Sequence, residues 1–187
     1  MFRMVFIGFF CLHLAVLAQG PEKPPPPNVI LIMVDDLGYH DLGSYGHPSI
    51  RTPHLDRMAR EGVRFTDFYS GATVCTPSRM ALLTGYYPNR LGWERGVVGH
   101  LMPKGAGLSP SVTTLAEVFK EAGYETALIG KWHLGDAASF RPHQQGFQHT
   151  YYLNKSNNQT RKVWRGDEVV EDPFDNRLLT EQFFSEA

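Results

Sequence analysis

Residues 28–34 (NVILIMV) are the most restrictive segment of this chain, because they are almost entirely apolar and rich in β-branched side chains. A continuous run of this kind is typical of a strand buried on both faces of a parallel sheet. Parallel strands need long crossover connections, which are usually helices. The run therefore predicts an α/β domain, and Asp35 and Asp36 mark the end of its first strand.

Helical and extended signals alternate along the rest of the chain. Helices are expected from Thr52-Pro53 to just before Gly62, from Pro77 to Gly85, and from a capping box at Thr114 to Gly123. Further extended segments are expected at 63–69 and 125–130, and a polar surface loop at 153–166. This alternation predicts a mainly parallel sheet flanked by helices.

Both ends of the chain carry organisational signals. Residues 1–20 combine Arg3, an apolar run and small residues, which predicts a secretory signal peptide without a stable membrane span. Residues 21–27 form a proline-rich spacer, so the folded part is expected at 28–187 in a secreted or periplasmic protein. A new amphipathic helix begins near Thr180 just before the sequence stops, so we expect an N-terminal fragment of a longer chain.

Composition excludes several classes of protein. Lys and Arg total 18 against 19 Asp and Glu, and this balance gives no basic surface for a nucleic-acid partner. The two cysteines, Cys11 and Cys75, are too few for a disulfide framework.

Two groups of residues carry candidate chemistry. Asp35 and Asp36 are adjacent carboxylates that suit a hard divalent cation, although a solvated turn explains them as well. Cys75 precedes Pro77 at a helix start, with Arg79 one turn later, which fits either an activated thiol nucleophile beside an anion site or a buried cysteine.

Since sites in α/β sheets lie beyond the carboxyl ends of strands, we expect the Asp pair and residues 131–133 in one crevice. Strand alternation would point Lys131 and His133 to the same side.

These motifs resemble those of a known enzyme family. Residues 75–85 (CTPSRMALLTG) are similar to the first signature of the formylglycine-dependent sulfatases, and residues 123–133 (GYETALIGKWH) to the second. The opening segments 28–38 and 52–65 also resemble this family, and the similarity is greatest to its arylsulfatase A and N-acetylgalactosamine-6-sulfatase branch. The resemblance implies an alkaline-phosphatase-like α/β fold and makes 28–187 the N-terminal part of the catalytic domain.

The resemblance also implies a chemistry for each residue. Cys75 would be oxidised by a formylglycine-generating maturation enzyme to an aldehyde, formylglycine (3-oxoalanine), whose hydrate attacks sulfur and then expels sulfate. Asp35, Asp36 and residue 75 would hold Ca²⁺, with Mg²⁺ as an alternative, and Arg79 would orient the hydrate. Lys131 would bind hydrate and sulfate, and His133 would contact the second hydroxyl as a catalytic and substrate-binding residue.

The implied reaction is hydrolysis of a sulfate ester on a carbohydrate or an aryl group. A later histidine, an Asp-Asn pair and a second lysine of the family's site have no counterpart here, so we expect the 187-residue chain alone to be inactive. Two alternatives remain at the level of the sequence. One is a phosphonate or phosphate ester hydrolase of the same superfamily, and the other is an inactive truncated remnant.

Overall fold

The computed structural model describes residues 24–187, which fall in two compact units divided between Tyr39 and His40. The predicted signal peptide at 1–20 lies outside the described residues, as do residues 21–23 of the predicted spacer.

The first unit corrects the prediction of a buried strand at 28–34. This segment is extended but forms no strand, and its side chains are largely exposed, with Ile30 at 85%. A strand requires a neighbour that completes its backbone hydrogen bonds, and within the described part of the chain no strand pairs with this segment. The apolar run alone therefore does not produce the strand.

The boundary between the units falls within a short 3-10 helix, η1 (Tyr39–Asp41), which is followed in the second unit by another one, η2 (Gly43–Tyr45), and by α2 (Pro53–Glu61). The predicted bounds of α2 are confirmed, with proline in its first turn and Gly62 at its end. Thr52 occupies the N-cap position, but its hydroxyl does not cap the helix. It donates instead to Asp56 (2.8 Å) and accepts from the Gly43 backbone N–H (2.9 Å), which ties α2 to η2.

A four-stranded sheet forms the centre of this unit. Its strands are β1 (Ala127–Lys131), β2 (His149–Leu153), β3 (Val163–Arg165) and β4 (Glu168–Glu171), in that order across the sheet. β1 and β2 are parallel, whereas β2/β3 and β3/β4 are antiparallel, so the sheet in the described residues is mixed.

Two segments have a structure that differs from the one predicted for them. Residues 63–69 form no strand, and their side chains are exposed, so the prediction of a second extended segment is not matched by any pairing in the described chain. Residues 153–166 were predicted as a surface loop, but they end β2 and contain β3. Val163 is fully buried, so pairing with β2 and burial outweigh the polar composition of the segment.

The remaining helices frame the sheet. They are α3 (Cys75–Thr84), η3 (Pro88–Leu91), α4 (Leu115–Glu121), η4 (Ala138–Phe140), η5 (Pro142–Gln145) and α5 (Leu179–Glu186). α3 starts two residues earlier than predicted, so Cys75 is its first residue rather than a residue ahead of it. The predicted capping box of α4 is confirmed, since Thr114 and Glu117 each bond the other's backbone N–H.

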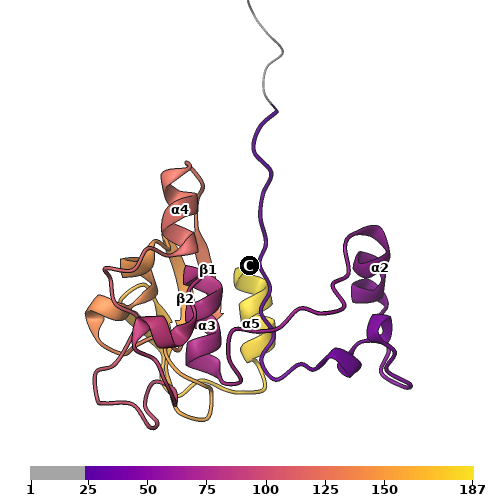
Figure 1. Ribbon diagram of the computed structural model, residues 1–187. Coiled ribbons are helices and arrows are strands. Elements are labelled where there is room, and N and C mark those ends of the chain that lie inside the picture. Colours follow the sequence, from indigo (N-terminus) through magenta and orange to yellow (C-terminus); the bar gives the residue numbers. More distant parts are fainter. Residues whose placement is uncertain (1–23) are drawn as a thin grey trace, which may run out of the picture. The chain divides into compact units, whose positions relative to one another are not determined.

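Two hydrophobic clusters show that the sheet is covered on both faces. Tyr152 packs with Met80 of α3, Ala116 of α4 and Trp132, and Figure 1 shows α3 and α4 beside β1 and β2. Its neighbours Tyr151 and Leu153 pack instead with Phe174 and with Leu179 of α5. Because successive side chains of a strand point to opposite faces, α3 and α4 cover one face and α5 the other. Among the described residues, no helix is long and apolar enough to cross a membrane.

Replacement of Thr114 by alanine is expected to destabilise the second unit by about 1–2 kcal/mol. The Thr114 hydroxyl accepts from Glu117 N–H (3.2 Å) and donates to the buried Gln145 carbonyl (2.7 Å), and alanine removes both bonds. Urea denaturation would measure the loss. Thr114→Ser should retain most of the stability, and Thr113→Ala at the exposed neighbouring position should change it little. Equal effects of Thr113→Ala and Thr114→Ala would contradict the assignment.

Candidate active site

The first turn of α3 and the end of β1 bring together two residues that lie far apart in the sequence. Lys131 Nζ lies 3.0 Å from Cys75 Sγ, within hydrogen-bonding distance. Cys75 is partly exposed and is not disulfide-bonded within the described residues. Both side chains are therefore placed for joint action on a ligand at the start of α3.

Arg79 links the same two elements through the main chain. Its Nη1 donates to the Lys131 carbonyl oxygen at 2.6 Å. Because Arg79 lies on α3, one turn after Cys75, this bond holds the end of β1 beside Cys75. The structure thus gives Arg79 a positioning contact that the sequence did not predict.

Thr76 forms a second connection, which is fully buried. Its hydroxyl donates to the His133 carbonyl (2.8 Å) and accepts from the Val98 backbone N–H (3.0 Å). The His133 carbonyl and the Val98 N–H therefore both find their hydrogen-bond partner in one side chain. Helix α3, the residues after β1 and the 96–101 loop are held together around this hydroxyl.

His133 reaches the site by a route different from the predicted strand alternation. β1 ends at Lys131, and His133 has a left-handed backbone conformation (φ 59°), so its direction is set by a turn. Its Nε2 lies 3.1 Å from the Val98 carbonyl oxygen, and its Nδ1 lies 3.5 Å from Ser156 Oγ. A carbonyl can only accept, which places the proton of the neutral ring on Nε2 and leaves Nδ1 as an acceptor.

The surroundings of His133 favour this neutral form. The side chain is 1% exposed, and burial lowers its pKa to about 4, against the opposing effect of the Val98 hydrogen bond. The positive charges of Lys131 and Arg79 lower the pKa further, while the Asp136 carboxylate raises it. At neutral pH the imidazole of His133 is therefore uncharged, with its lone pair on Nδ1 facing Ser156 Oγ.

The predicted metal ligands Asp35 and Asp36 lie in the first unit. Both are exposed in a turn, and Asp36 has a left-handed backbone (φ 57°). Carboxylate oxygens suit Ca²⁺ or Mg²⁺, but Ca²⁺ takes six to eight oxygen ligands. Among residues 24–187, no group of three or more His, Cys, Asp or Glu side chains is placed to hold a metal ion. The donor type fits a hard cation, and the two carboxylates supply only part of a complete set.

Sequence reasoning missed three participants. Val98 acts through its backbone, which has no side-chain signal, and Ser156 lies in a segment that was predicted as a loop. Thr76 was visible within the Cys75 motif, but its role requires knowledge of the neighbours it bonds.

Comparison with known proteins identifies the family. A model of the family described as Sulfatase matches residues 27–185, which is most of the chain. The chain belongs to the sulfatase family.

Individual relatives agree with this assignment. The sulfatase chain is 52% identical to human arylsulfatase A over 137 residues, which cover 72% of this chain and 26% of that protein. Over 127 residues it is 56% identical to mouse steryl-sulfatase, covering 64% of this chain and 20% of that protein. It therefore spans about a quarter of the length of these curated relatives.

Solved structures support the predicted fold class. The crystal structure of Ps i-CgsB matches with a TM-score of 0.74 at 29% identity, over 86% of this chain and 40% of the other. The α/β, alkaline-phosphatase-like class is thereby confirmed for this sulfatase chain, although the sheet within its described residues is mixed.

Acid should destabilise the fold through His133. Below pH 6.5 an unfolded chain protonates this histidine, whereas the folded chain does so only near pH 4, so stability is complete above pH 6.5 and falls as the pH drops. The contribution is about 3 kcal/mol at most. Urea unfolding of wild type and His133→Gln between pH 7 and pH 4 would measure it, because glutamine does not titrate.

The exposed His100 offers a matched control for this measurement. His100→Gln should retain the wild-type pH dependence, whereas His133→Gln should show a shallower one. Parallel pH profiles for wild type and His133→Gln would contradict the assigned burial effect.

Proposed function

We propose that this sulfatase chain supplies the nucleophile half of a site that hydrolyses sulfate esters, with residue 75 reacting after oxidation of Cys75 to formylglycine. The observation that carries the proposal is the 3.0 Å approach of Lys131 Nζ to Cys75 Sγ at the first turn of α3. In this proposal Sγ stands where an oxygen on Cβ of the modified residue would lie. The match to the sulfatase family favours sulfate over phosphonate or phosphate esters.

The residues around position 75 suit the proposed chemistry. When formed and hydrated, formylglycine would supply one hydroxyl for attack on sulfur, which expels the alcohol, and a second whose deprotonation regenerates the aldehyde and releases sulfate. Lys131 would donate a hydrogen bond to residue 75 and place a positive charge beside the sulfate oxygens. Arg79 and Thr76 would keep Lys131 and His133 in place through main-chain bonds.

His133 is the base that we assign to the second hydroxyl. A base must be unprotonated at working pH, and the lowered pKa of His133 meets this requirement. Nδ1 is the atom of His133 that would accept the proton. In the structure the hydroxyl that faces this atom is Ser156 Oγ, at 3.5 Å.

Asp35 and Asp36 would hold the cation, for which we propose Ca²⁺, with Mg²⁺ as the alternative. The cation would neutralise charge on the sulfate oxygens. The incomplete donor set within the described residues is the reason that we propose no turnover for the 187-residue chain by itself.

The proposed substrate is a sulfated carbohydrate or an aryl sulfate. One similar structure was solved in complex with its substrate D-glucosamine-2-N,6-O-disulfate, with a TM-score of 0.66 at 29% identity over 85% of this chain and 30% of the other. The substrate of that relative supports a sulfated carbohydrate as the proposed substrate. We also propose a formylglycine-generating maturation enzyme as a partner, and export to a secreted or periplasmic location.

The decisive test is the chemical state of residue 75. Chain co-expressed with a formylglycine-generating enzyme should yield a tryptic peptide with an aldehyde at position 75 that a hydrazide traps, and Cys75→Ala should yield none. The 187-residue chain should hydrolyse aryl sulfate no faster than Cys75→Ala. A free thiol at residue 75 in a preparation that hydrolyses sulfate esters would overturn the proposal.

In a longer active protein that carries this chain, Lys131→Ala should lower kcat for an aryl sulfate by roughly 10²–10³-fold while the aldehyde content stays the same. Lys120→Ala, on the exposed side of α4, is the matched control and should leave kcat within about twofold. Faster hydrolysis of the phosphonate ester of the same alcohol would instead indicate the neighbouring enzyme class.

A further inference from the structure

Asp136 connects the two segments that follow the parallel strands β1 and β2. Because these strands are parallel, both segments leave the sheet at the same edge. One carboxylate oxygen of Asp136, Oδ1, accepts from Asn154 Nδ2 at 3.0 Å, and the other, Oδ2, lies 2.8 Å from Lys155 Nζ. Each oxygen of this carboxylate is therefore bound by one of two successive residues of the segment after β2.

Backbone and packing constrain the turn that carries Asp136. His133 has a left-handed backbone (φ 59°), Leu134 is fully buried, and Gly135 has a φ of 137°. A Cβ on Gly135 would lie 2.4 Å from Phe140 Cβ, so this close approach of the chain requires glycine. The Asp136 carboxylate is therefore presented from a packed turn that begins at His133.

Lys155 also lies against the loop at 96–101. A Cβ on Gly99 would lie 3.3 Å from Lys155 Nζ, so the backbone of this loop passes beside the ammonium group. The same loop provides the Val98 carbonyl, which accepts from His133 Nε2 (3.1 Å). The ion pair of Asp136 with Lys155 therefore lies beside the loop that binds one nitrogen of the His133 ring.

The residue after Lys155 contacts the other nitrogen of that ring. Ser156 Oγ lies 3.5 Å from His133 Nδ1, which is the outer limit of a hydrogen bond, so a small displacement of the segment breaks the contact. The charge of Asp136 also reaches the ring directly, since it raises the pKa of His133 against the larger effect of burial. Asp136 is thus close to His133 in space and is bonded to the two residues that precede Ser156.

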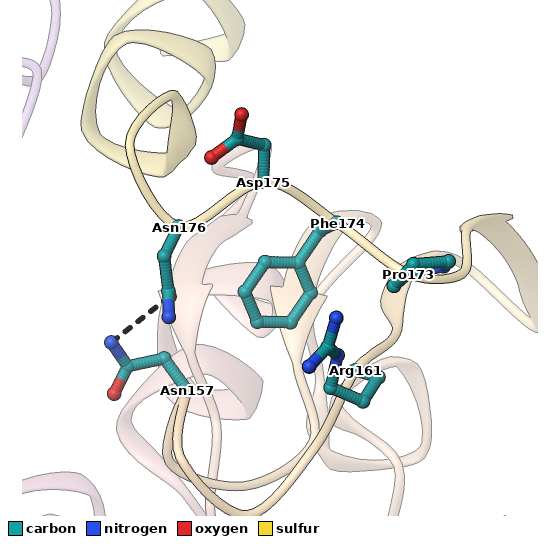
Figure 2. Close-up of a pocket in the computed structure, with 6 residues that line it drawn as sticks. All are labelled: Asn157, Arg161, Pro173, Phe174, Asp175 and Asn176. Atoms are coloured by element: carbon teal, nitrogen blue, oxygen red, sulfur yellow. Dashed lines mark hydrogen bonds between the residues drawn. The ribbon is translucent and has the colours of Figure 1, made fainter.

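A second anchor holds the other side of Ser156. Asn157 Nδ2 donates to Asn176 Oδ1 at 3.2 Å, the bond dashed in Figure 2. Both asparagines are exposed and neutral, whereas the contacts of Asp136 combine a charged acceptor with partly buried donors. Charge-assisted hydrogen bonds are stronger than neutral ones, so the anchor at Asp136 is the one expected to set the position of Ser156.

We propose that Asp136 is a positioning residue for the proposed base. Its carboxylate holds residues 154 and 155, which places the Ser156 hydroxyl against His133 Nδ1 and fixes the direction in which the ring presents its lone pair. The proposal rests on the proposed function for the role of His133. It goes beyond that function by assigning the geometry of the base to a carboxylate outside both signatures, 75–85 and 123–133.

The His133 ring reports on this contact without any reaction. Two-bond proton–nitrogen NMR spectra of the full 187-residue chain carrying Cys75→Ala give the chemical shift of each ring nitrogen. At neutral pH, Asp136→Ala should shift the Nδ1 signal of His133 as Ser156→Ala does, because both variants remove the hydroxyl from Nδ1. The variant with both substitutions should show no further shift, and the proton on Nε2 should stay in place.

Control variants separate this effect from a general loss of stability. Asp172→Ala breaks a comparable ion pair, that with Lys162 at 3.5 Å, and should leave the Nδ1 signal unchanged. Asn157→Ala removes the neutral anchor and should shift the signal less than Asp136→Ala. Lys155→Met removes the ammonium group but keeps the stem, so it should shift Nδ1 in the same direction and replaces Asp136→Ala if that variant does not fold.

Kinetics provide the second readout. In a longer active protein that carries this chain, Asp136→Ala should lower kcat for an aryl sulfate roughly tenfold while KM and the aldehyde content at residue 75 stay the same, because the base is misplaced. Asp136→Ala combined with Ser156→Ala should be no slower than Ser156→Ala alone, since residues that act through one another are not additive. Asp172→Ala should leave kcat unchanged.

Three results would overturn the proposal: a His133 Nδ1 signal that Asp136→Ala leaves in place, an equal shift by Asp172→Ala, or effects of Asp136→Ala and Ser156→Ala on kcat that add. Because the NMR experiment uses Cys75→Ala, its outcome is independent of the chemistry of residue 75. Conversely, failure to trap an aldehyde would overturn the proposed function and leave the measured link between Asp136 and the His133 ring intact.

Discussion

The buried hydroxyl of Thr76 is the contact on which the geometry of the candidate site depends. It satisfies backbone groups from two other segments at once, the carbonyl of His133 and the N–H of Val98. A buried backbone group without a partner costs about 1–3 kcal/mol, so replacing this side chain would leave two such groups unsatisfied. The position of Cys75 is thereby fixed relative to β1, because Thr76 is its immediate neighbour on α3.

The same arrangement sets the electrostatics of the site. His133 is buried because its backbone is held by Thr76, and burial in turn lowers its pKa to about 4. The Val98 carbonyl then selects the tautomer by accepting from Nε2. One loop residue, Val98, therefore contacts both the Thr76 hydroxyl and the His133 ring through its two backbone groups.

Local signals in the sequence were sufficient where a short segment determines its own structure. The capping box at Thr114 and the proline start of α2 are of this kind, and so is the extended segment predicted at 125–130, which the structure has as β1 at Ala127–Lys131. Prediction failed where a partner decides the outcome. The run at 28–34 has the composition of a strand but no strand pairs with it in the described chain, whereas the polar segment containing β3 pairs with β2 and buries Val163.

The site shows the same division. The signatures at 75–85 and 123–133 implied one site for Cys75, Arg79, Lys131 and His133, but they did not predict that Arg79 bonds the main chain of Lys131. Nor could alternation predict the direction of His133, since a left-handed turn replaces the strand at that residue. The two signatures identify the side chains. The backbone contacts of Thr76 and the direction of the His133 ring depend instead on the loop at 96–101, which has no recognisable sequence motif.

The two parts of the proposed site differ in how they are held. Cys75 and Lys131 are 3.0 Å apart, and the buried Thr76 hydroxyl holds the backbone of His133, so these contacts join α3 to the end of β1 within residues 40–187. Asp35 and Asp36 lie in an exposed turn after an apolar segment that has no strand partner in the described chain. Adjacent carboxylates repel each other, and a divalent cation relieves that repulsion only when further ligands complete its shell. The contacts around residue 75 therefore join two elements of one unit, whereas a complete site for a cation requires oxygen ligands in addition to the two carboxylates.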